Sequence, residues 1–100
     1  MRFGLFYTLR FPEPWSQEGE YKCLWETVEQ VTYAEEMGFD GLMLNEHHST
    51  PFCMGGAMNV EASILARITT KAKIVLLGNI IPIWDDPLWL VEQLAMIDVI

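Results

Sequence analysis

The sequence is poor in positive charge and in long apolar runs. Its 100 residues hold 6 lysines and arginines against 14 aspartates and glutamates, a formal net charge of -8. This balance is poorly suited to a nucleic-acid backbone or an anionic membrane surface. No run reaches the roughly 18 apolar residues of a membrane span, and the first residues lack the apolar core of a secretory signal. We therefore expect a cytoplasmic protein that binds neither nucleic acid nor membrane.

Cysteine and several catalytic signatures are also scarce. The two cysteines, Cys23 and Cys53, form no CxxC pair and no zinc-like spacing, so we expect free thiols and no metal site. The chain contains no GxGxxG, P-loop, GxSxG or HExxH motif. The missing glycine fingerprint disfavours a dinucleotide-binding fold of the Rossmann type.

The chain does contain an alternation of short apolar runs and segments with helical periodicity. We predict strands at residues 2–8, 41–45 and 74–77, and helices at residues 20–37, 59–70 and from 87 to the end. Strands that are apolar on both sides are typical of a parallel sheet covered on two faces. Three strand–helix units cannot close or cover such a sheet, so we expect residues 1–100 to be part of a larger α/β domain.

Local signals refine the helix ends. Gly38 is the expected C′ glycine of the first helix, Asn59 the N-cap of the second and Asp86 the N-cap of the third. Residues expected to break regular structure in the loops include Pro12, Pro14 and Pro51. The expected buried stripes are Tyr21, Leu24, Val28 and Val31 in the first helix, and Val60, Ile64 and Ile68 in the second.

The most informative motif is Glu46-His47-His48, which directly follows the second predicted strand. In parallel α/β folds the carboxyl ends of the strands carry the site. Because side chains alternate along an extended chain, Glu46 and His48 should point one way and His47 the other. Three roles remain open at this point: metal ligation, a structural histidine–carboxylate hydrogen bond, or acid–base work near neutral pH.

A second candidate follows the third predicted strand, at Gly78-Asn79-Ile80-Ile81-Pro82. Glycine permits a close backbone approach or an unusual φ, and the asparagine amide can both donate and accept. The alternative is an ordinary βα turn. In the next segment, Trp84-Asp85-Asp86-Pro87, helix capping by Asp86 is favoured over a paired-carboxylate catalyst.

Taken in order, these segments resemble one known family. Residues 1–6, 34–40, 44–48, 78–82 and 86–98 are similar to the bacterial-luciferase-like flavin monooxygenases, with compatible spacing across essentially the whole chain. The resemblance implies a (β/α)8 TIM barrel, a fold of roughly 250 residues. Residues 1–100 would then be the N-terminal three βα units of a single barrel domain.

The resemblance also implies a chemistry. A separate flavin reductase would supply reduced FMN, which reacts with O2 to give a C4a-(hydro)peroxyflavin that oxygenates a small organic substrate. His47, the first histidine of the triplet, is the implied catalytic residue. The alternatives are an F420-dependent oxidoreductase on the same barrel and a catalytically silent flavin-binding relative. A homodimer or heterodimer is expected.

The remaining site residues follow from the same resemblance. A non-prolyl cis peptide or a bulge is expected between Gly78 and Ile81, at a cost of about 3 kcal/mol for a cis bond. The residues expected to bind the cofactor are Gly78, Asn79 and Ile80. The residues expected to contact the substrate, or to support His47 without contacting the substrate, are Tyr7, Glu46 and His48.

Overall fold

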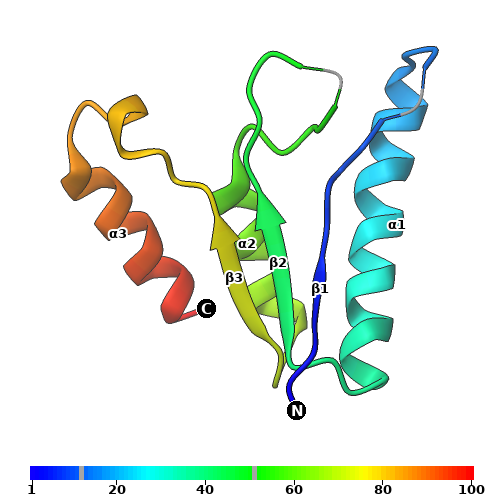
Figure 1. The fold of residues 1–100 in the computed structure, drawn as a ribbon. Helices are drawn as coiled ribbons and strands as arrows, with labels where there is room; N and C mark the ends of the chain where they lie inside the picture. Colours follow the sequence, from blue (N-terminus) through cyan, green and yellow to red (C-terminus); the bar gives the residue numbers. More distant parts are fainter. Residues whose placement is uncertain (12, 51) are drawn as a thin grey trace.

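The computed structural model describes residues 1–11, 13–50 and 52–100, and strands alternate with helices along it (Figure 1). Two of the expected loop breakers, Pro12 and Pro51, lie outside the described residues. The elements are β1 (Gly4–Phe6), α1 (Gln17–Glu36), β2 (Gly41–Asn45), α2 (Met58–Ile68), β3 (Lys73–Leu77), the short 3-10 helix η1 (Ile81–Ile83) and α3 (Pro87–Asp98).

The three strands form one parallel sheet in the order β1-β2-β3. Leu5 lies opposite Leu42, and Leu42 lies opposite Ile74, so the strands run in step from one edge to the other. The predicted α/β fold with three parallel strands is therefore confirmed. Because the carboxyl ends of all the strands lie at one end of the sheet, the loops that follow them are brought together there.

One face of the sheet carries the core. Leu42 and Leu44 of β2 are 0% and 2% exposed. They belong to a single buried cluster that α1 and α2 complete, which consists of Val31, Ala34, Leu42, Leu44, Met58, Ala62 and Leu65. Figure 1 shows α2 behind the sheet. The alternate residues along β1 and just beyond it, and along β3, that pack against this cluster are Leu5, Tyr7, Ile74 and Leu76.

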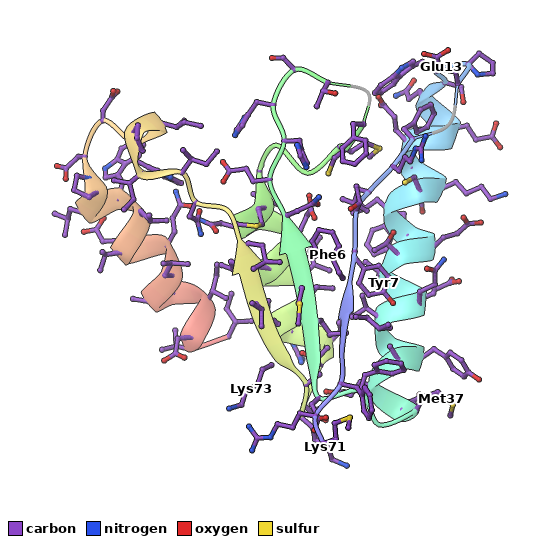
Figure 2. All side chains as sticks on the ribbon, in the orientation of Figure 1. Phe6, Tyr7, Glu13, Met37, Lys71 and Lys73 are labelled. Carbon is purple, nitrogen blue, oxygen red and sulfur yellow. The ribbon has the colours of Figure 1, made fainter. Side chains whose placement is uncertain are left out.

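The opposite face of the sheet carries no helix among the described residues, and Figure 1 is drawn looking onto it. Phe6, labelled in Figure 2, lies level with Met43 and is 57% exposed, while Leu77 at the end of β3 is 50% exposed. This agrees with the expectation that three strand–helix units cannot cover both faces of such a sheet. The strands are apolar on both sides, but these helices all pack on one side.

Two predicted boundaries differ from those in the structure. α1 begins at Gln17 rather than Glu20, since the Ser16 hydroxyl accepts from the Gly19 N–H at 3.0 Å and caps the helix. β1 is shorter than predicted, although the Tyr7 N–H still donates to the Met43 carbonyl at 2.8 Å beyond its end. Tyr21 is 68% exposed and does not belong to the buried stripe of α1.

The second and third helices correct two further expectations. α2 begins at Met58, so Asn59 lies inside the helix and is not its N-cap. Val60 is 63% exposed, because the buried face of α2 is built on Met58, Ala62 and Leu65 instead. The third helix was expected to continue to the end of the chain, but α3 ends at Asp98.

Two helix-end predictions are confirmed. The Asp86 carboxylate accepts from the Leu88 N–H at 2.9 Å and caps α3. Gly38 has a φ of 91° just after α1, the left-handed conformation of a C′ glycine. Within the described ranges, no helix is long and apolar enough to cross a membrane.

A carboxylate near the end of α1 secures the other end of the sheet. Glu35 accepts backbone N–H groups from Thr70 at 2.9 Å, Lys71 at 2.6 Å and Ala72 at 2.7 Å, in the turn that leads into β3. The hydrogen bond from Ala72, with those from Lys71 and Thr70, outweighs the opposing effect of burial and lowers the pKa of Glu35. Lys71 is labelled at this end of the sheet in Figure 2.

Glu35→Ala should lower the free energy of unfolding by roughly 1–2 kcal/mol at neutral pH, because three N–H groups lose a charged acceptor at a partly exposed site. Because the pKa of Glu35 is lowered on folding, its contribution is lost as pH falls through that value, and variant and wild type should converge in acid. Urea unfolding across pH tests this, with exposed Glu36→Ala as the control. Equal stability of the two variants at neutral pH would contradict it.

Candidate active site at the carboxyl ends of the strands

The side chain of Glu46 connects the ends of β2 and β3. One carboxylate oxygen accepts the backbone N–H of Asn79 and, at 3.4 Å, that of Ile80. The other oxygen lies 2.7 Å from Nε2 of His48. The Glu46 side chain is 7% exposed, so these donors replace most of the water that a carboxylate would otherwise bind.

The hydrogen bonds keep the Glu46 carboxyl ionised. Burial alone would raise its pKa, but the hydrogen bonds from His48, Asn79 and Ile80 and the charge of His48 outweigh burial and hold the pKa below its usual value. An ionised carboxylate has no proton to give near neutral pH, and both of its oxygens are already engaged by hydrogen bonds. Glu46 is therefore suited to orienting its neighbours.

Gly78 provides the space that Glu46 occupies. A Cβ at this position would lie 2.6 Å from the Glu46 Cβ and 2.7 Å from its Oε2. The sequence allowed either a close approach or an unusual φ at Gly78. Close approach is the correct reading, since the positive φ falls on the next residue, Asn79, at 59°.

The expected cis peptide or bulge between Gly78 and Ile81 is not found. The peptide bonds of this segment are trans, and the pairing of β2 with β3 is regular up to Asn45 opposite Leu77. The irregularity takes the form of the left-handed Asn79. That conformation lets two successive N–H groups converge on one acceptor oxygen, and Glu46 supplies the acceptor.

The two histidines point in different directions, as alternation predicted. His48 is paired with Glu46, whereas the His47 ring packs edge-on against Phe52 with ring centroids 5.0 Å apart. A cavity of about 520 Å³ opens between the loop after β2 and the first turns of α2 and α3, and Glu46, His48 and Asn79 line it. His47 is not part of that lining.

Tyr7 lies apart from this group. It packs against the core on the helix-facing side of β1 and lines a hollow beside α1 (Figure 2). Burial raises the pKa of its hydroxyl. The structure thus brings together Glu46, His48, Gly78 and the backbone of Ile80, and leaves Tyr7 outside their contacts.

Sequence reasoning missed two amide side chains of this site. Asn59 Nδ2 donates to Oε1 of Gln93 at 3.0 Å, and Asn79 Nδ2 donates to Oδ1 of Asn59 at 3.0 Å. Asn59 is 7% exposed, and Gln93 lies on α3 and lines the same cavity. The signal for Asn59 was a polar residue at the start of a helix, which is more typical of a cap.

Comparison with known families adds a finding that covers the whole chain. A family model described as luciferase-like monooxygenase matches residues 1–100. The chain belongs to this family. Membership supports a general assignment as a flavin-type monooxygenase or oxidoreductase. A search of curated proteins found no match to this chain.

The luciferase-like chain has one further unusual group next to the site. Glu61 lies in the first turn of α2, beneath the loop that contains Cys53 and Gly55, and burial raises its pKa to about 7. Cys53 is buried and donates to Oδ1 of Asn45 at 3.4 Å. Among the residues that the structure describes, no three histidine, cysteine or acidic side chains form a group able to hold a metal ion.

Gly78→Ala should destabilise the protein by about 1–3 kcal/mol, because the added methyl group must displace the Glu46 side chain. Gly56→Ala is the matched control, since the nearest atom to a Cβ there is the His47 carbonyl oxygen at 3.4 Å. Chemical denaturation of both variants measures the difference. Equal losses of stability in the two variants would show that the close approach of Gly78 and Glu46 does not limit the side chain at position 78.

Glu61 should make stability fall as pH rises from its usual pKa of 4.5 to about 7, since in this window the folded state retains a proton that the unfolded chain has lost. Glu61→Gln, which cannot ionise, should flatten this fall and exceed wild type in stability near pH 8. Denaturation at several pH values tests this, with exposed Glu29→Gln as the control. An unchanged pH slope in Glu61→Gln would refute the assignment.

Proposed function

We propose that residues 1–100 form the first three βα units of a (β/α)8 barrel domain in an FMN-dependent monooxygenase. The family match over all 100 residues carries this proposal. The sequential strand order and the packing of the helices on one face support it, because consecutive units of a barrel are arranged in this way. A doubly wound sheet would place helices on both faces.

The helix-free side of the sheet suits the aromatic ring system of a flavin at the carboxyl ends of its strands, where the site of a barrel is built. It presents apolar side chains that include Phe6 and Leu77, and the loop after β3 adds Ile80, which is 47% exposed. In the proposed site, Gly78, Asn79 and Ile80 hold the ring from the β3 side. Lys71 and Lys73 lie at the far end of the sheet, so neither is placed to bind the FMN phosphate there (Figure 2).

Bound reduced FMN would supply the electrons with which O2 is activated and one of its oxygen atoms inserted into a small organic substrate. In this proposal a separate flavin reductase delivers the reduced cofactor, as the resemblance to the luciferase-like monooxygenases implies.

His47 is the proposed acid–base group. It follows β2 at the carboxyl end of the sheet, and its ring is steadied by the edge contact with Phe52. An imidazole can hold or release a proton near neutral pH, which suits a group that manages a proton beside the substrate. Glu46 and His48 are hydrogen-bonded to each other and would hold in place the loop that carries His47.

His47→Ala should leave folding and flavin binding largely intact while cutting product formation by roughly 10²-fold or more, the scale of a lost acid–base group. Electrons from reduced FMN should then appear as hydrogen peroxide. The measurement is the product formed per reduced flavin oxidised, in the full-length protein.

His48→Ala is the matched control for this experiment. Wild-type coupling in His47→Ala with lost coupling in His48→Ala would invert the two roles, and no change in either would make the motif structural. Absorbance titration of the wild type with reduced FMN and with F420 tests the cofactor. Binding of F420 alone would replace the FMN assignment.

A further inference from the structure

A chain of side-chain amides runs from α3 to the turn after β3. Gln93 accepts from Asn59, and Asn59 in turn accepts from Asn79, with both hydrogen bonds 3.0 Å long. Gln93 and Asn59 each accept through the side-chain oxygen, and Asn59 and Asn79 each donate through the side-chain nitrogen, so both hydrogen bonds run in the same direction. All three side chains line the cavity of about 520 Å³ that Glu46 and His48 also line.

The amide chain ends on a backbone conformation that needs support. Asn79 has a φ of 59°, in the left-handed region that is unfavourable for residues other than glycine. Asparagine tolerates this region better than most residues, yet it stays there only if the surroundings favour it. The hydrogen bond from its side chain to Asn59 is such a contact, and Asn59 is itself held by Gln93.

Glu46 depends on this conformation. Its carboxylate is satisfied only while the N–H groups of Asn79 and Ile80 converge on it, and it then orients His48. The polar contacts thus form one continuous path from α3, through α2 and the turn after β3, to the loop after β2. Gln93 is the outermost member of this path.

We propose that Gln93 and Asn59 are positioning residues that hold the turn of Asn79 and Ile80 in the shape needed to bind reduced FMN. This inference rests on the proposed function for the identity of the ligand. Neither side chain is required to touch the cofactor. Their effect reaches it through the turn, whose N–H groups are fixed by Glu46 and whose Ile80 side chain borders the proposed ring site.

Gln93→Met tests the proposal, because methionine matches the length of glutamine but offers Asn59 only a weak sulfur acceptor in place of the amide oxygen. Gln93→Glu keeps an acceptor oxygen at the same reach and is the rescue variant. Gln30→Met makes the same chemical change at an exposed position of α1 and is the control. Gln93→Ala provides a second test if Gln93→Met does not fold.

Two quantities are measured in the full-length protein: amide hydrogen exchange at Asn79 and Ile80, and the Kd for reduced FMN under anaerobic conditions. In Gln93→Met both should rise by about tenfold, since a local opening of the turn becomes easier. Gln93→Glu should return both to within about twofold of wild type, and Gln30→Met should change neither.

Unchanged exchange at Asn79 and Ile80 in Gln93→Met would overturn the proposal. Faster exchange with an unchanged Kd for reduced FMN would also overturn it, because the amides would then be merely structural. A wild-type protein that does not bind reduced FMN would refute the proposed function instead. The exchange measurement would then decide alone whether Gln93 holds the turn.

Discussion

The carboxylate of Glu46 is the group on which the ends of the strands depend. It is almost fully removed from water, and a buried charge is costly unless hydrogen-bond donors replace the solvent. Its donors come from the end of β3 and from the loop after β2, so the charge is stable only when both segments are in place. One ionised side chain therefore fixes the relative position of two loops that are far apart in the sequence.

The residue types around Glu46 follow from this requirement. Position 78 has no room for a side chain, because the carboxylate fills that space. Position 79 must turn into the left-handed region so that two N–H groups reach one oxygen, and asparagine tolerates this better than most residues. The side chain of Asn79 then donates to Asn59, so the conformation of the turn after β3 is linked to a residue of α2.

The sequence predicts the local features of this fold well and its long-range contacts poorly. Residues 41–45 were predicted as β2 with the correct bounds, and Asp86 as a cap, because apolar runs and capping preferences act over a few residues. Asn59 was misassigned as a cap because its partner Gln93 lies on another helix. The role of Gly78 as a space for Glu46, and the left-handed Asn79, likewise depend on contacts between distant segments, which no local pattern encodes.

The first strand, β1, lies at an edge of the sheet. β1 pairs with β2 on one side, and in the described residues its other edge has no partner. In the proposed barrel that edge would receive the final strand, so β1 would become fully hydrogen-bonded only when the first and last strands of the barrel pair. Such a closure has the largest loop entropy of any pairing in the domain and is expected to come late in folding. Until then β1 is an exposed β-edge, and its short length limits the surface it offers for mispairing.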